Sequence, residues 1–323
     1  MIRTLYRNNK GGVTTDVPEA HWKVVIRDTG GLFWVDFADE PPERVQKLFV
    51  DVFHFHPLAI EDALQQAHVP KVDDWGEYVY AVLHGLSFDP ANNELDTNEI
   101  DIFLGKNFLV THHKNPQASA DHVWKACQRD ERYLARGADY LLYHIADTLV
   151  SDYMPVVDQL DDAIDHLEDE VFTSASRVVL SNIFSIKRAV LHLRRIISPQ
   201  REVMNRFARD TYGAVDPSER IYFRDVYDHL VRLADINDTL RDLIGGALDT
   251  YLSVSANRTN QTMKILTIFS AMFLPISFIA GFFGMNFEWL PFSEPWFLIF
   301  GLVLMIIVPA IMWWWIERKG WIE

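Results

Sequence analysis

The sequence predicts an α/β domain, then long stalk helices, and finally two transmembrane helices at the C-terminal end. Three observations support this order. Two uncharged apolar runs lie near the end of the chain, strand and helix patterns mix over the first 116 residues, and only helical periodicity lies between. We expect residues 1–116 to form the α/β domain, 117–258 the long helices and stalk, 259–316 the transmembrane module, and 317–323 a tail.

Five segments of the first domain are rich in β-branched and aromatic residues, which is typical of strands. They cover residues 22–28, 32–37, 77–88, 99–105 and 107–113. Between them, residues 42–53 and 57–67 have helical spacing, with proline at an N-terminal position. The pattern predicts a mixed sheet accompanied by helices.

Beyond the α/β domain, residues 118–171 and 176–209 have the spacing of long amphipathic helices. A third helix is predicted to begin at Asp216-Pro217-Ser218-Glu219, a capping box with proline at the first helical position. Because no proline follows until Pro275, we expect this helix to continue into the first membrane span. Gly245-Gly246 lies within this predicted helix, where each glycine lowers helix stability by about 1 kcal/mol relative to alanine.

Residues 265–283 and 295–316 contain no charged side chain, and each run is long enough to cross about 30 Å of hydrocarbon. Tryptophans gather at the ends of the second run, as at a membrane interface. The connecting loop carries only acidic charge, whereas basic residues flank the pair of spans, which predicts that both termini are cytoplasmic. These basic residues are Arg258, Lys264, Arg318 and Lys319.

The formal net charge of −15 comes from residues 1–257. Such a surface repels nucleic acid and gathers cations, although the same charge also serves simply to keep a domain soluble. Cys127 is the only cysteine, so no cysteine metal site is possible, and residues 1–10 lack the apolar region of a signal peptide. The chain has no glycine-rich phosphate loop and no hydrolase motif, so we expect no enzyme. Four histidines form only a weak metal signal: His54, His56, His112 and His113.

Two helices from one chain cannot enclose an aqueous path, so transport would require an oligomer with one helix from each copy around an axis. Small or weakly polar residues recur every three or four positions along the first span. They form either a pore lining or a packing seam between helices. The residues of this stripe are Asn260, Met263, Thr267, Ser270, Leu274, Ser277 and Gly281.

Gly284-Met285-Asn286 follows the stripe at the outer mouth of the first span. Neutral oxygens at this position would hydrogen-bond to a hydrated Mg²⁺ ion, which gives up its waters reluctantly. A second charged feature is the acidic stretch 161–170, which is either a solvated helix surface or part of a ring of negative charge in an oligomer. The sequence leaves its role open.

The chain resembles the CorA family of divalent-cation channels. The resemblance rests on Gly284-Met285-Asn286 between two C-terminal spans, and it continues through residues 56–62, 138–142, 222–229, 248–252, 264–267 and 275–286. It therefore covers essentially the whole chain. Leu274 stands where the family often has methionine, and only Arg318 and Lys319 remain of its C-terminal basic cluster.

The resemblance implies a funnel-shaped homopentamer in the cytoplasmic (inner) membrane that admits Mg²⁺ passively and closes when Mg²⁺ binds between cytoplasmic domains. Co²⁺ or Ni²⁺ are further candidate ions. By position, one regulatory site would pair Asp62 with Asp249 of the adjacent subunit, and a second would involve Glu61, Asp147 and Asp225. The implied pore constrictions are Asn260, Met263, Leu266, Leu274 and Asn286.

Two other functions compete with a Mg²⁺ channel. One is a proton-coupled zinc transporter of the ZntB type, a branch that tends to replace Met285. The other is a two-span sensor or scaffold that conducts no ion. The intact Gly-Met-Asn tripeptide favours Mg²⁺, and Asn286→Ala would leave ion flux unchanged only in the sensor.

Overall fold

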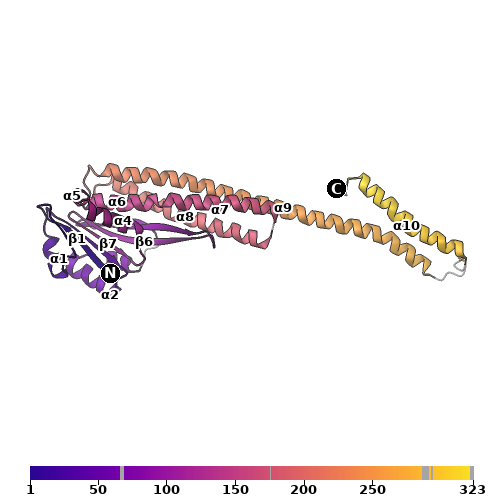
Figure 1. Ribbon diagram of the computed structural model, residues 1–323, viewed down its shortest axis with the longest axis horizontal. Helices are drawn as coiled ribbons and strands as arrows, with labels where there is room; N and C mark the ends of the chain where they lie inside the picture. The colour runs from indigo at the N-terminus through magenta and orange to yellow at the C-terminus, as the bar shows by residue number, and fades with distance from the viewer. Residues whose placement is uncertain (66–68, 175, 286–290, 292–293, 321–323) are drawn as a thin grey trace. The chain divides into compact units, whose positions relative to one another are not determined.

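The structure is a computed structural model that describes residues 1–65, 69–174, 176–285, 291 and 294–320 (Figure 1). It divides into two compact units, Met1–Leu248 and Asp249–Glu323.

A seven-stranded mixed sheet forms the centre of the first unit, in the order β2-β1-β3-β7-β6-β5-β4. Only β3 and β7 pair in parallel, and the other neighbours are antiparallel. Four predicted strands are confirmed, whereas β1, β2 and β4 were not foreseen. The bounds are β1 Ile2–Arg7, β2 Val13–Thr15, β3 Leu32–Ala38, β4 Lys71–Asp74, β5 Tyr78–Asp89, β6 Glu94–Gly105 and β7 Phe108–His113.

Helices α1 (Glu19–Val25), α2 (Pro42–Leu48) and α3 (Pro57–Gln65) cover one face of the sheet, and a π-helical turn, η1 (Phe49–Phe53), follows α2 (Figure 1). Their core is aromatic, with the rings of Phe55 and Phe103 stacked at 4.1 Å. The prediction of a strand over 22–28 was wrong. Trp22 and Val25, three residues apart, are both buried on one side of α1, so the local period is helical.

The opposite face carries α4 (Ala118–Arg129), α5 (Arg132–Ala135), α6 (Ala138–Ser151), α7 (Tyr153–Thr173) and α8 (Arg177–Arg209) (Figure 1). The predicted helix over 176–209 is confirmed, but the one over 118–171 is broken into four. Gly137 lies at φ +123° directly before α6, a conformation that favours glycine and cannot continue a helix. The helical pattern of residues 118–171 therefore belongs to successive helices that change direction.

Helix α9 (Arg220–Phe283) runs without a break from the first unit into the first apolar run, as predicted, and α10 (Pro295–Arg318) holds the second run. Helix α9 begins after the expected capping box. Residues 217–219 form a turn, and the Glu219 carboxylate accepts two hydrogen bonds from Arg136, at 2.8 and 2.9 Å, instead of closing the box. Tertiary pairing thus overrides the local capping signal.

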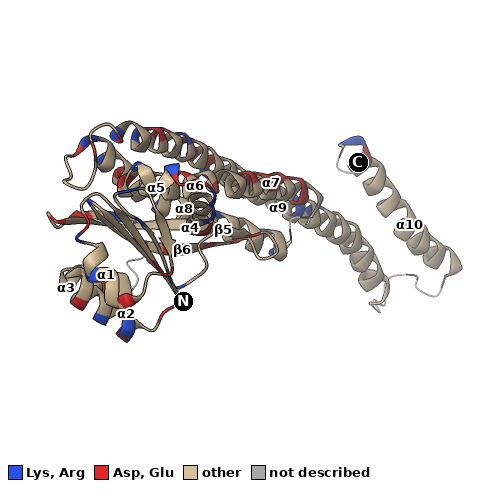
Figure 2. Ribbon diagram, turned by 60° about the vertical axis from the view of Figure 1, so that its left-hand side comes forward, with Lys and Arg blue, Asp and Glu red and all other residues tan. Residues whose placement is uncertain are grey.

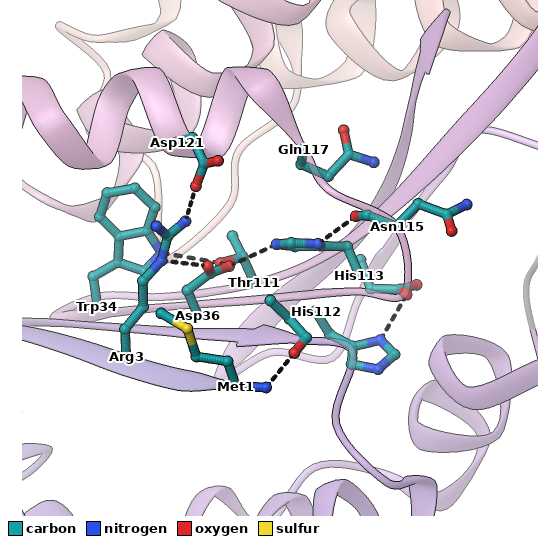
Figure 3. A network of polar contacts seen from close by, with 12 residues as sticks. Met1, Arg3, Trp34, Asp36, Thr111, His112, His113, Asn115, Gln117 and Asp121 are labelled. Atoms are coloured by element: carbon teal, nitrogen blue, oxygen red, sulfur yellow. Dashed lines mark hydrogen bonds and ion pairs between the residues drawn. The ribbon is translucent and has the colours of Figure 1, made fainter.

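A buried polar network joins β1, β3 and β7 (Figure 3). The fully buried Asp36 carboxylate accepts hydrogen bonds from Arg3 Nε at 2.7 Å and Thr111 Oγ1 at 2.5 Å, and it lies 3.3 Å from His113 Nε2. His112 Nδ1 lies 3.1 Å from Asp101. These two histidines therefore pair with carboxylates of neighbouring strands, in keeping with a structural role.

Candidate functional site

Asp147 of α6 and Asp225 and His229 of α9 form the one group of metal-ligand side chains found in the described part of the chain. One ligand atom from each lies within 4.8 Å of the others. Asp225 and His229 are four residues apart, so they occupy one face of α9, opposite Asp147. Two carboxylate oxygens and an imidazole nitrogen suit a divalent cation, and the nitrogen also suits Co²⁺, Ni²⁺ or Zn²⁺.

The electrostatics of this acidic site favour an added positive charge. Burial raises the pKa of the half-buried Asp147, the charge of His229 lowers it, and the charge of Asp225 raises it further. The same carboxylates act on Tyr143, one turn before Asp147 on α6. Burial and then the charges of Asp147 and Asp225 raise the pKa of the Tyr143 phenol to about 12. A cation at the site would oppose the effect of the carboxylate charges and lower the pKa of both groups.

An ion pair stacked between two tyrosines holds α6 against the start of α9 next to this site. The Arg136 guanidinium lies over the Tyr140 ring at 3.8 Å and over the Tyr222 ring at 4.8 Å while it binds Glu219. The Asp139 carboxylate also accepts a hydrogen bond from the Asp216 backbone nitrogen, at 2.8 Å. The contacts fix the two helices that carry the three ligands.

The other predicted regulatory carboxylates lie outside this group of three. Asp62 of α3 accepts a hydrogen bond from Lys71 at 2.5 Å, and Lys71 lies 3.1 Å from Asp73. Glu61 is exposed on α3 and accepts a hydrogen bond from Gln65 at 3.2 Å. Asp249 is exposed on α9, at the first position of the second unit. His229 was not predicted, although its spacing of four residues from Asp225 on a helix was a readable signal.

The predicted pore stripe lies on the exposed surface of α9 in the second unit. Of the predicted pore residues, Met263, Leu266 and Leu274 expose 55%, 57% and 72% of their surface, within a continuous run of exposed apolar side chains of the kind that lipid or a partner covers. The most apolar window of this helix has no buried residue, and both α9 and α10 are long and apolar enough to cross a membrane. Figure 2 shows charged residues on α10 only at its C-terminal end. The remaining stripe residues, Asn260, Thr267, Ser270, Ser277 and Gly281, are exposed as well.

Several hydroxyl groups along this part of α9 donate to the helix itself. Thr259, Thr262 and Thr267 each donate to the carbonyl oxygen four residues earlier, at distances of 3.0, 3.0 and 2.8 Å. Their donors are therefore satisfied without water or lipid.

Helix α9 closes with a turn in which Gly284 N donates to Ala280 O at 3.0 Å and Met285 N donates to Phe282 O at 3.2 Å. Asn286, the last residue of the predicted filter, lies outside the described residues. Within the second unit, the end of α9 contacts α10 through Phe283. A Cβ atom at Gly301 would come within 2.9 Å of this ring, so only glycine fits there without a shift.

The acidic stretch 161–170 lies on α7, where Figure 2 shows carboxylate-bearing residues. Ile164 and Leu167 face the core, and the acidic residues around them are mostly exposed, as on a solvated helix surface. Burial and the charges of Asp165, Asp162 and Asp158 raise the pKa of Asp161.

Three comparisons place the chain among known proteins. The family model of the CorA-like Mg²⁺ transporter protein matches residues 29–318. The cobalt/magnesium transport protein CorA of Thermotoga maritima is 34% identical over 311 residues, which cover 96% of this chain and 88% of that protein. The zinc transport protein ZntB of Yersinia pseudotuberculosis is 24% identical over 274 residues, which cover 82% and 81%.

The solved full-length CorA magnesium transporter of Methanocaldococcus jannaschii has the same fold, with a TM-score of 0.84 at 22% identity over 99% of this chain and 98% of that chain. Fold, apolar helices and matches together define a membrane transporter of divalent cations. The chain belongs to the CorA-like Mg²⁺ transporter family.

Proposed function

We propose that the protein is a Mg²⁺ channel that admits Mg²⁺ passively through the cytoplasmic membrane. The observation that carries the proposal is the family match across residues 29–318, together with Gly284-Met285-Asn286 at the end of an exposed, weakly polar stripe on α9. The name of the Thermotoga relative supports Co²⁺ as a second transported ion. In this proposal the backbone and amide oxygens at 284–286 bind the hydrated ion by hydrogen bonds.

The channel is a homopentamer in this proposal, with one α9 from each subunit around the axis. Residues 1–116 and 117–258 form the cytoplasmic part, 259–316 the membrane module and 317–323 a cytoplasmic tail. Support comes from the exposed apolar surface of α9, which needs lipid or other subunits to cover it. The basic residues that precede the first span and follow the second span support cytoplasmic termini.

Closure follows when Mg²⁺ binds between cytoplasmic domains. The site at Asp147, Asp225 and His229 is one candidate, with Glu61 as a further ligand from the family pattern. The pair of Asp62 and the neighbouring subunit's Asp249 is the other. Because Lys71 already pairs with Asp62, a cation at the second site must compete with the lysine ammonium group.

Liposomes that contain the purified protein and a Mg²⁺-selective or Zn²⁺-selective dye test the transport proposal. We expect Mg²⁺ uptake that Asn286→Ala and Asn286→Asp reduce strongly. The matched control is Asn92→Ala in the turn between β5 and β6, which should leave uptake unchanged. Mg²⁺ uptake that survives both substitutions of Asn286 would reject the filter assignment.

A zinc transporter is the second candidate, favoured by the similarity to the Yersinia protein and by the imidazole in the three-residue site. It predicts Zn²⁺ uptake that depends on a pH gradient and little Mg²⁺ uptake in the same liposomes. Passive Mg²⁺ uptake without a pH gradient would exclude it.

A further inference from the structure

Helices α8 and α9 of the first unit enclose a small polar cavity of about 80 Å³. It lies apart from the three-residue metal group and from the membrane span. The residues that α8 contributes recur at intervals of three and four, and so do those of α9, so one face of each helix meets the other. The lining consists of Arg194, Ile197, Ser198 and Arg201 from α8 and Ala234, Asn237 and Asp238 from α9.

A buried amide oxygen in this cavity has no partner. Asn237 is 1% exposed, and its Oδ1 atom accepts no hydrogen bond in the described structure. An unpaired buried acceptor costs about 1–3 kcal/mol, so a ligand that offers a proton donor here would be stabilised. The cavity is too small for a nucleotide or a peptide, but it holds a group of a few heavy atoms.

The charge in the cavity is positive. Arg194 lies 3.9 Å from Asp238, and Asp238 lies nearer to a third arginine, Arg241, at 3.2 Å. One carboxylate is therefore shared between two arginines, while Arg201 adds a further guanidinium to the lining. Helix α8 as a whole carries eight basic residues against one acidic residue, in a chain of net charge −15. An anion is the ligand that this charge selects.

We propose that the cavity binds free inorganic phosphate. Arg194 and Arg201 donate to its oxygens in the fork geometry that suits phosphate, and the Ser198 hydroxyl donates a further hydrogen bond. At neutral pH inorganic phosphate keeps at least one proton, and this O–H donates to Asn237 Oδ1. Sulfate carries no proton at this pH and leaves the amide oxygen unpaired. The bound anion ties α8 to α9.

Phosphate and sulfate titrations of the purified full-length protein, by calorimetry and by thermal unfolding at fixed free Mg²⁺, test the proposal. We expect phosphate to bind and raise the unfolding temperature more than sulfate does at equal ionic strength. Arg201→Gln should weaken phosphate binding at least about tenfold, since a charged hydrogen bond contributes about 1.5–3 kcal/mol. Arg195→Gln, exposed on the same helix and outside the cavity, is the matched control and should bind phosphate as the wild type does.

Ser198→Ala provides a second variant, with a smaller loss of affinity, in case Arg201→Gln impairs folding. A titration with glycerol 3-phosphate distinguishes free phosphate from the phosphoryl group of a larger molecule. Weaker binding of the ester than of phosphate supports the free anion, because the ester is larger and its dianion has no proton to donate to Asn237, and equal binding of the two would overturn that assignment. Equal binding of phosphate and sulfate, binding of neither, or undiminished binding by Arg201→Gln would overturn it. No arm measures ion flux, so the result is independent of the transport proposal.

Discussion

Replacement of Asp225 by asparagine should change the stability of the protein in opposite directions with and without a divalent cation. The Asp147 and Asp225 carboxylates offer ligand atoms within 4.8 Å of each other. Two unit charges at that distance repel by about 1 kcal/mol in water and by about 3.5 kcal/mol at an effective dielectric constant of 20. Because Asp225 is exposed, the lower figure applies. In a chelator, Asp225→Asn should therefore be more stable than the wild type by about 1 kcal/mol.

Saturating Mg²⁺ should reverse the order of stability. A ligand at one hundred times its Kd stabilises the folded state by about 2.7 kcal/mol, and a tenfold weaker site gains about 1.4 kcal/mol less. The wild type, with all three ligands, should then unfold at the higher temperature. Thermal unfolding in detergent, with EDTA and then with a Mg²⁺ series, measures both differences.

Asp228→Asn is the matched control, since Asp228 is an exposed carboxylate on the same helix and outside the group of three. It should shift little in either condition. The metal-site interpretation fails if Asp225→Asn is less stable than the wild type in EDTA, or if Mg²⁺ stabilises both proteins equally. Cation binding elsewhere in the chain affects wild type and variant alike, so the difference isolates this site.

Three further predictions concern other parts of the chain. Burial alone would raise the pKa of Asp36, but the hydrogen bond and the charge of His113 help to hold the Asp36 pKa below its ordinary value. Burial alone would lower the pKa of His113, but the hydrogen bond and the charge of Asp36 raise the His113 pKa above its ordinary value. The pair therefore stabilises the folded protein most between about pH 4 and pH 6.5. In denaturant titrations, Asp36→Asn should lower the free energy of unfolding by about 3 kcal/mol in this range, and by less at more acidic or more alkaline pH. Gly301→Leu should lower stability in detergent by about 1–3 kcal/mol, because its Cβ meets a ring of α9. Lys71→Gln should release Asp62 and lower several-fold the Mg²⁺ concentration that gives half-maximal protection from proteolysis.

Each of these predictions has a control in the chain. Asp121→Asn removes the exposed end of the buried network and should cost under about 1 kcal/mol. Ala310→Leu places the same leucine side chain at an exposed position of α10, and Lys47→Gln removes an exposed lysine of α2. A flat pH dependence for Asp36→Asn, a fully stable Gly301→Leu, or an unchanged Mg²⁺ midpoint for Lys71→Gln would contradict the corresponding prediction.

The parts of the fold that the sequence predicted are those with a strong local pattern. Two long uncharged runs, four of the strands and the continuity of α9 needed only hydropathy, β-propensity and the absence of proline. The failures occurred where distant residues decide the structure. Trp22 packs into a helix because of the aromatic core beneath it, and Glu219 leaves its cap because Arg136, 83 residues away along the chain, binds it.

The candidate site was foreseen in part. Asp147 and Asp225 came from the resemblance alone, because 78 residues of sequence separate them and no periodicity relates α6 to α9. His229 was missed, since a lone histidine on an amphipathic helix is usually structural. Lys71 beside Asp62 was missed as well, because the pairing joins a helix to a strand across residues 66–68. Local spacing identifies ligand types, whereas the packing of distant elements decides which of them meet.

The threonine hydroxyls that donate to the backbone of α9 present only hydrogen-bond acceptors to their surroundings. Once a hydroxyl has given its proton to the helix, only its lone pairs remain for anything outside. The water molecules around a metal cation point their hydrogens outward, and these hydrogens can donate to the lone pairs. Chloride and phosphate need donors, which these hydroxyls no longer offer. In the proposed pore, these hydroxyls would therefore favour a hydrated cation over an anion without contributing any charge.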